Sequence, residues 1–198
     1  MKKIFILLIV VFGSKAVWAQ GGGNFVISYP ISFPMGDLKD HIGATSFRGI
    51  SLEFNKRAKP NLDIGLEASW HVFYERVSEK PYVNETATIT GTQYRYTNAV
   101  PLLAAAKWLK TTSNAKTTPY FGLGIGTTYV ERATDFGLYR LTNDAWQFCL
   151  RPELGVQVKA GYGASFMLGV KYYANFAGGD LDAQSYLSIN IGFVFSGD

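Results

Sequence analysis

Cysteine is almost missing from this 198-residue chain, because Cys149 stands alone. A single thiol excludes an internal disulfide framework. Histidine is scarce as well: His41 and His71 are the two in the sequence, and no group of His, Cys, Asp or Glu residues has the spacing of a metal site. We therefore expect neither a metal ion nor another cofactor in this protein.

Long apolar runs are missing too. A membrane-spanning helix needs roughly 20 consecutive apolar residues, and no stretch of the chain reaches that length. The apolar run over residues 4–12 is short, follows two lysines and precedes small residues that end at Ala19, which is the layout of a secretory signal. We predict a signal peptide over residues 1–19, cleaved after Ala19, and a single domain over residues 20–198.

Most of the excess of positive charge lies in this leader. The chain carries 19 Lys and Arg against 15 Asp and Glu, but Lys2, Lys3 and Lys15 belong to the leader, which leaves 16 basic against 15 acidic residues. Proteins that bind nucleic acid usually carry a clustered basic surface. We therefore expect no nucleic-acid partner.

The pattern that dominates the rest of the chain is the alternation of apolar and polar residues, which is the period of a β-strand. It is regular over residues 62–75, 120–129, 165–172 and 187–195, and less regular near residues 24–34, 47–56, 93–109 and 146–159. Several runs reach the roughly 9–11 residues with which a tilted strand crosses a bilayer. An open sheet would leave unpaired backbone groups in lipid. The sequence thus predicts a closed, antiparallel transmembrane β-barrel of about eight strands.

The connections between these expected strands alternate in length. Short ones cover residues 56–61, 110–118 and 160–163, and longer ones cover residues 35–46, 78–92, 132–145 and 175–184. Short periplasmic turns and longer extracellular loops are typical of outer-membrane barrels, with both chain ends on the periplasmic side. Pro30, Pro101 and Pro152 fall inside expected strands, where each removes a backbone donor, so we expect bulges or strand ends there.

Aromatic residues gather where these strands would leave the bilayer. The periplasmic set is Trp108, Phe121, Phe166, Phe193 and Phe195, and the outer set is Tyr74, Tyr94, Tyr96, Tyr129, Trp146, Tyr172 and Tyr186. Two such girdles are what solvation at the two membrane interfaces predicts.

The pattern as a whole resembles the small outer-membrane barrels of the OmpA and OmpX type and, more generally, the outer-membrane β-barrel domain family. Its most specific part is the end of the chain, where Leu187, Ile189, Ile191, Phe193 and Phe195 alternate with other residues. That run looks like the terminal signal read by the barrel-assembly machinery. The resemblance implies a place in the cell outer membrane and three kinds of partner. These are lipid and lipopolysaccharide, the assembly machinery during biogenesis, and other outer-membrane proteins.

The inward face of such a barrel carries charges of both signs. By parity it holds Glu53, Glu67, His71, Glu75, Arg95, Lys107, Arg151, Glu153 and Lys171. An eight-stranded barrel is just wide enough for side chains to fill, and buried charges must pair. We expect a polar network in the lumen, which is either a structural plug of salt bridges or a gated ion path. Gly122, Gly124 and Gly126 would leave room for bulky side chains such as Phe73, and Cys149 also faces inward.

A catalytic group is the weaker hypothesis for this interior. Ser69, His71 and Glu67 combine the residue types of an activated serine. They alternate along one strand, where each two-residue step spans about 6–7 Å, so we expect no direct hydrogen bonds between them and no catalytic site. The residues favour a non-enzymatic structural or interaction barrel, alone or as an accessory subunit of a larger outer-membrane complex. A lipid-modifying enzyme or a small gated channel is the alternative.

The expected outer loops carry aromatic residues among polar ones. These are Tyr82, Phe136, Tyr139 and Phe176. Either they pack on each other and cap the barrel, or they form a binding surface for a partner protein, a surface glycan or a neighbouring barrel, since loops on a rigid scaffold commonly carry such sites.

Overall fold

The computed structural model describes residues 23–84, 87–110 and 116–197. The predicted signal peptide, residues 1–19, lies outside the described residues. Along the chain these residues form β1 (Gly23–Pro34), α2 (Asp37–His41), β2 (Gly49–Lys59), β3 (Leu62–Asn84), β4 (Ala87–Leu109), β5 (Thr117–Phe136), β6 (Tyr139–Gly161), β7 (Ala164–Asn175) and β8 (Tyr186–Ser196). No helix formed by the described residues has the length and apolarity needed to cross a membrane.

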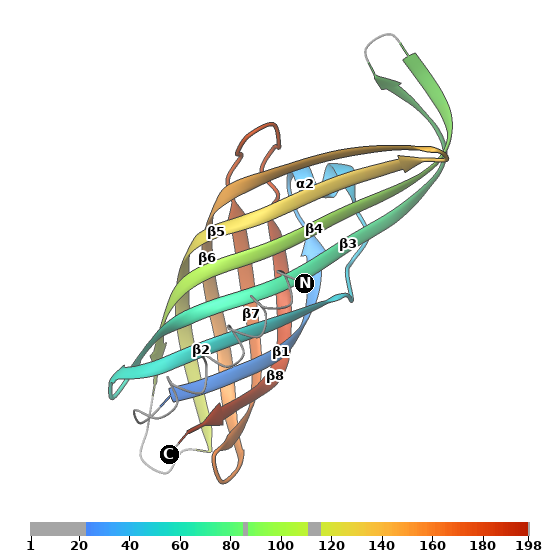
Figure 1. The fold of residues 1–198 in the computed structure, drawn as a ribbon. Coiled ribbons are helices and arrows are strands. Elements are labelled where there is room, and N and C mark those ends of the chain that lie inside the picture. The colour runs from blue at the N-terminus through green and yellow to red at the C-terminus, as the bar shows by residue number, and fades with distance from the viewer. Residues whose placement is uncertain (1–22, 85–86, 111–115, 198) are drawn as a thin grey trace, which may run out of the picture.

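The strands close into one antiparallel barrel (Figure 1). Each strand pairs with the next along the chain, and β1 pairs with β8 from Asn24 opposite Ser196 to Pro34 opposite Tyr186. Closure gives every strand a neighbour on both sides, as a bilayer requires. The predicted closed, eight-stranded antiparallel barrel is confirmed.

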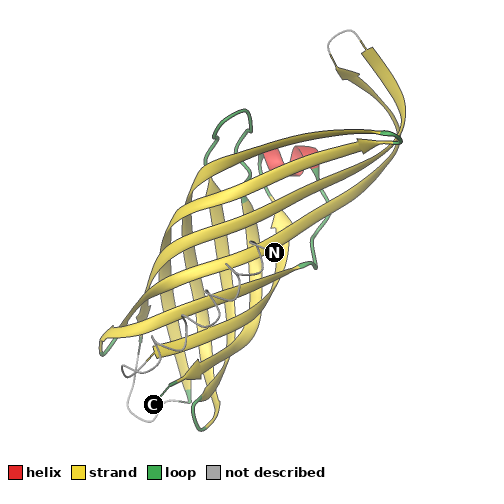
Figure 2. Ribbon diagram, viewed as in Figure 1, coloured by secondary structure: helices red, strands yellow, loops and turns green. Residues whose placement is uncertain are grey.

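The wall of the barrel is uneven in length (Figure 2). Strands β1, β2, β7 and β8 have 11 or 12 residues, whereas β3 to β6 have 20 to 23. The long strands continue past the rim as two hairpins, so the loops predicted over residues 78–92 and 132–145 are mostly strand, and that prediction is wrong. Both segments contain the Thr, Tyr, Val, Ile or Leu residues that suit strands. Gly137, with φ of 58°, forms the β5–β6 turn.

The other two outer connections are genuine loops, and they fold over the mouth of the barrel. The first contains α2, whose Leu38 is fully buried, as is Ile42 just after it. The second buries Leu181 and Gln184. These side chains close the outer end of the lumen.

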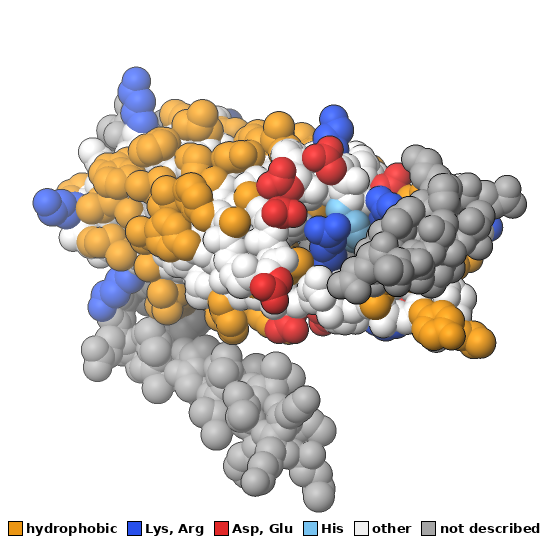
Figure 3. Space-filling model, turned by 90° about the horizontal axis from the view of Figure 1, so that it is seen from above, with side chains coloured by type: hydrophobic (Ala, Val, Ile, Leu, Met, Phe, Trp, Pro, Cys, Tyr) orange, Lys and Arg blue, Asp and Glu red, His pale blue; other side chains and the backbone are white. Residues whose placement is uncertain are grey.

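Side chains alternate strictly between the interior and an apolar outer wall. In β3, Asp63, Glu67 and Ser69 are buried, while Leu66 is 66% exposed. Figure 3 shows apolar side chains over much of the wall and charged side chains near the outer end. A continuous apolar surface of this kind is unfavourable in water, and lipid solvates it.

Aromatic pairs lie at both edges of this apolar wall. Trp108 stacks on Phe121 with ring centroids 5.7 Å apart, and Tyr129 lies 5.3 Å from Trp146. Tyr186 was expected in the outer girdle, and that expectation is wrong, because its side chain is fully buried in the lumen. It shares the parity of the buried Ser188 and Asn190, which are the next inward positions of β8.

The prolines inside strands mark interrupted pairing without a bulge. Each keeps a partner on one side, opposite Asn190, Thr128 and Leu123 in chain order. On the other side the β1–β2 ladder ends before Pro30, and the neighbouring ladders skip Pro101 and Pro152 with no change of register. The prediction of bulges or strand ends is therefore wrong at these positions, since all three prolines lie inside strands. Register shifts lie near strand ends instead, as between Arg57 and Lys59.

The apolar wall makes a direct prediction about lipid contact. Leu66 pairs with Ala104, which lies midway between Trp108 and Val100, the partner of Tyr129. Because it faces the middle of the apolar band, Leu66→Arg should lower the free energy of unfolding in lipid vesicles by about 2–4 kcal/mol.

Leu138 is the matched control, since it is fully exposed at the tip of the β5–β6 hairpin. Leu138→Arg should change the free energy of unfolding by less than about 0.5 kcal/mol. Denaturant titrations in the same vesicles compare the two variants. Equal effects at the two sites would contradict the assignment of the membrane-facing band.

Candidate functional site

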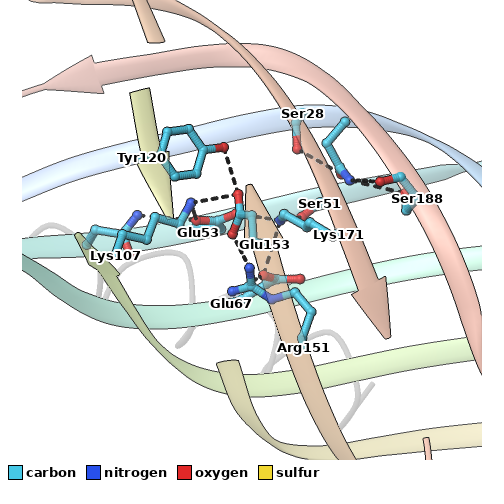
Figure 4. A network of polar contacts seen from close by, with 12 residues as sticks. Ser28, Ser51, Glu53, Glu67, Lys107, Tyr120, Arg151, Glu153, Lys171 and Ser188 are labelled. Carbon is cyan, nitrogen blue, oxygen red and sulfur yellow. Dashed lines mark hydrogen bonds and ion pairs between the residues drawn. The ribbon is translucent and has the colours of Figure 1, made fainter. Parts of the chain in front are cut away.

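Six charged side chains form a ring across the middle of the lumen (Figure 4). They are Glu53 from β2, Glu67 from β3, Lys107 from β4, Arg151 and Glu153 from β6, and Lys171 from β7. Each residue is at most 2% exposed. The strict alternation of β-strands turns all six inward, and the register of the barrel brings them to the same height.

One half of the ring is organised by Lys171. Glu53 and Glu67 lie directly opposite each other on β2 and β3, and such like-charged neighbours are destabilising when unpaired. Lys171 reaches them from β7, with its Nζ 2.5 Å from Glu53 Oε1 and 3.2 Å from Glu67 Oε2. Arg151 Nη2 lies 2.9 Å from Glu67 Oε2. This last contact is an ion pair without hydrogen-bond geometry.

The other half of the ring passes over a strand that carries glycine. Arg151 also pairs with Glu153, and Lys107 pairs with Glu53 and lies 3.4 Å from Glu153 Oε1. Lys107 and Glu153 lie on opposite sides of β5, and both are in register with Gly122. A Cβ atom at Gly122 would lie 3.2 Å from Glu153 Oε2 and 3.3 Å from Lys107 Cγ. The glycine lets the two charges meet, and the cycle of alternating signs closes.

Gly124 has the same role for the guanidinium of Arg151. A Cβ atom at Gly124 would lie 3.0 Å from Arg151 Nε and 3.1 Å from Arg151 Nη2. The glycines were expected to make room for bulky side chains such as Phe73, and that partner is wrong. Gly122 and Gly124 make room for the charged ring, whereas a Cβ atom at Gly126 would meet Leu102 and Leu103 of β4.

Hydroxyl groups complete the solvation of the carboxylates. Tyr120 donates to Glu153 Oε1 at 2.7 Å, and Tyr173 donates to Glu67 Oε1 at 2.5 Å. Ser69 donates to the same Glu67 oxygen at 2.9 Å. The expectation that Ser69 lies too far from Glu67 for a direct bond is therefore wrong, because the long glutamate side chain spans the step between alternate residues. The sequence analysis did not predict that Tyr120 and Tyr173 face the lumen. The signal was available, because each lies two residues from a predicted inward position, Gly122 on β5 and Lys171 on β7.

His71 lies beside the ring and belongs to an aromatic layer above it. Its Nδ1 is 2.9 Å from Ser32 Oγ, and its ring centroid is 4.8 Å from that of Tyr186. Tyr186 stacks on Tyr173 at 4.7 Å and packs against Phe73 at 5.2 Å. Ser69 is bonded to Ser51 and Glu67, so the described contacts do not join Ser69 to His71 as a nucleophile and its base.

Glu75 and Arg95, which sequence parity grouped with the ring, lie at the outer mouth instead. Glu75 accepts a hydrogen bond from the Gly43 backbone at 2.7 Å, and Arg95 donates to the His41 carbonyl at 2.9 Å. Both side chains hold the α2 loop over the barrel. Cys149 is buried in the lumen. In the described part of the chain, no three His, Cys, Asp or Glu side chains are arranged as a metal site.

No protein-family model matches the chain, and no curated protein matches it in sequence. Solved structures do match. Neisserial surface protein A has a TM-score of 0.57 and 12% identity, over 89% of this chain and 99% of that one. Ail, the attachment invasion locus protein of Yersinia pestis, has a TM-score of 0.54 and 11% identity, over 89% and 98%. OprG of Pseudomonas aeruginosa has a TM-score of 0.53 and 15% identity, over 89% and 95%.

The chain has the fold of the small outer-membrane β-barrels. This agreement covers 89% of the chain and matches the resemblance drawn from the strand pattern. The apolar outer wall, the aromatic pairs at its edges and the polar interior give this fold its physical setting, and together they place the barrel in the cell outer membrane.

Removing one charged side chain from the ring should strongly lower the free energy of unfolding. Arg151→Met leaves Glu67 and Glu153 buried with one cation fewer, which should lower the free energy of unfolding by about 3–5 kcal/mol. Unfolding of the refolded protein in denaturant, followed by tryptophan fluorescence, measures the loss.

Arg140→Met on the same strand is the matched control. The Arg140 side chain is 56% exposed and lies 3.7 Å from Glu131 and from Asp135. Exposed pairs of this kind contribute roughly 0–1 kcal/mol, so the control should be nearly neutral. If both variants lose the same stability, the ring is not the structural element described.

Proposed function

We propose that the protein is a non-enzymatic, non-conducting barrel that presents its long outer hairpins to another outer-membrane or surface protein. It would act as an interaction subunit rather than as a channel. The observation that carries this proposal is the pairing of a filled lumen with a four-stranded sheet that extends beyond the rim.

The filled lumen supports the absence of conduction. Three layers lie across the path: the charged ring, the aromatic layer of Phe73, Tyr173 and Tyr186, and the α2 loop with Leu38 and Ile42. Within the ring each cation contacts two carboxylates, so an ion passing through would have to break pairs that are buried at low dielectric.

The sheet that extends past the rim supports a role in binding. Strand β6 pairs with β5 from Tyr139 onward, but its pairing with β7 begins only at Cys149. Phe148 O accepts a hydrogen bond from Phe176 N of the last outer loop, but from Tyr139 to Ala145 the other edge of β6 has no strand neighbour among the described residues. An unpaired edge is a template for an added strand. Exposed Leu138, Tyr139 and Leu141 provide apolar contacts at its tip.

The charge of this hairpin favours a protein partner with basic side chains. Glu131 lies directly opposite Asp144, and Asp135 lies opposite Arg140, so this face carries more acidic than basic residues. Ail has been solved in complex with the heparin analogue sucrose octasulfate. The acidic face gives no support to a comparable polyanion on this hairpin, because like charges repel at short range.

Association with a partner is tested by changing the edge itself. Leu141→Lys places a charge on the β6 edge, a device that blocks strand addition. Wild-type protein, gently extracted from native outer membranes, should migrate on a native gel with a stoichiometric partner that mass spectrometry identifies. The amount of partner that migrates with the Leu141→Lys variant should fall at least about tenfold.

Tyr162→Lys is the control for this experiment, because Tyr162 is fully exposed in the short β6–β7 turn at the opposite end of the barrel. It should retain the partner. A wild-type protein that migrates alone would refute the role as a subunit, and equal loss in both variants would move the contact away from the β6 edge.

Conduction is tested separately in planar bilayers. Because the lumen is filled with paired charges, the purified barrel should give no unit conductance steps, while a general porin in the same bilayer serves as the positive control. Reproducible steps from the wild-type barrel would support the gated channel instead.

A further inference from the structure

A second polar feature lies at the outer mouth, apart from the ring and the β6 edge. It is a cavity of about 270 Å³ between the α2 loop, the β4–β5 wall and the last outer loop. Its lining residues are Asp37, Asp40, His41, Arg95, Arg132, Thr134 and Asp182. In Figure 3 a histidine is visible at the outer end among acidic and basic side chains. The cavity opens to the cell exterior in the orientation given by the short and long connections.

His41 is a buried lining residue with an unused hydrogen-bonding atom. Its residue is 6% exposed, and its Nε2 makes no hydrogen bond in the described structure. Burial, followed by the nearby charges of Arg132 and Arg95, lowers the pKa of His41 to about 3. The imidazole is therefore neutral at physiological pH, and a buried nitrogen of this kind normally has a partner.

Arg95 brings a guanidinium to the same cavity without a carboxylate partner. It donates to the His41 carbonyl at 2.9 Å and to Gln93 Oε1 at 3.1 Å, and the described residues give it no ion pair. Arg132 adds a second guanidinium to the lining. In the ring, by contrast, each cation contacts two carboxylates. Guanidinium groups are well suited to bind a planar carboxylate.

The opposite sign stands at the rim of the cavity. Asp37, Asp40 and Asp182 are exposed, and within residues 23–84, 87–110 and 116–197 their carboxylates form no ion pair within 4.0 Å. Two guanidinium groups and three carboxylates thus line one cavity. Arg95 forms no ion pair within 4.0 Å among the described residues, because Glu75, which lies opposite it in the β3–β4 register, accepts a hydrogen bond from the Gly43 backbone instead. A ligand with both charges would give Arg95 a carboxylate partner and would place its ammonium group against the rim carboxylates.

We propose that this cavity binds a small zwitterion of the amino-acid or dipeptide class. The ligand carboxylate lies against Arg95 and Arg132, the ammonium group faces the rim aspartates, and His41 Nε2 forms a hydrogen bond with the ligand. The volume lies at the lower end of the roughly 300–1,000 Å³ range of small-molecule sites, which suits a ligand of this size. The proposal does not depend on the strand partner proposed above.

The rim argues against a simpler anion. Phosphate or sulfate would fit the guanidinium groups alone, but three carboxylates at the entrance repel a multivalent anion. Blocking either end of the ligand is therefore the sharpest test of the zwitterion.

The test uses the full chain refolded in detergent micelles and isothermal titration with glycylglycine as the probe. N-acetylglycylglycine and glycylglycinamide each remove one charge, and each should bind at least about tenfold more weakly than glycylglycine. Inorganic phosphate should not compete. Lack of heat with millimolar glycylglycine, equal binding of a blocked form, or competition by phosphate would each overturn the proposal.

Two variants locate the binding at this cavity. Asp182→Asn removes a rim carboxylate and should weaken glycylglycine binding about tenfold, while Asp180→Asn, an exposed neighbour outside the lining, should leave it unchanged. Arg95→Gln should abolish binding, but Arg95 also holds the His41 carbonyl, so heat-modified gel mobility must first show that the barrel is folded. An unchanged affinity in Asp182→Asn would place the dipeptide elsewhere.

Discussion

The closed cycle of alternating charges in the lumen is the constraint on which the rest of the barrel depends. Three carboxylates and three cations balance, and removal of any one would leave its neighbours buried and short of a counter-charge. Because the members come from β2, β3, β4, β6 and β7, the cycle requires these strands to keep one common register. Strand β5 contributes glycine at the same level, which makes space rather than charge.

This packed interior moves any function to the exterior of the barrel. Above the charged ring, the aromatic side chains of Phe73, Tyr173 and Tyr186 fill the lumen, and Leu38 of the α2 loop closes its outer end. A barrel filled in this way is a rigid support, and rigid supports commonly carry binding sites on the segments that project from them. Here those segments are the β3–β6 extension and the loops around the outer mouth.

Sequence reasoning predicted the face that most strand residues take, because alternation depends only on position along a strand, but it placed the buried Tyr186 in the outer girdle. It could not predict height, since height depends on register between strands. Parity therefore placed Glu75 and Arg95 with the ring, although both lie at the mouth. The Ser69–Glu67 bond was missed for a related reason, because backbone spacing ignores the reach of a glutamate side chain. The sequence predicts loops where the outer hairpins form, because mixed polar sequences suit an exposed strand as well as a loop.

The two polar sites differ in how their charges are used. In the ring every charge is buried and engaged by opposite charges, and such networks serve structure when they are complete. At the mouth, His41 is buried with an unused nitrogen, and Arg95 has amide and carbonyl partners but no carboxylate. Buried polar groups that lack a hydrogen-bond or ion-pair partner cost stability. At the mouth, a ligand entering from the exterior could supply the missing partners and offset that cost. Of the two polar sites, the mouth rather than the larger and more heavily charged ring therefore has groups that a ligand can complete.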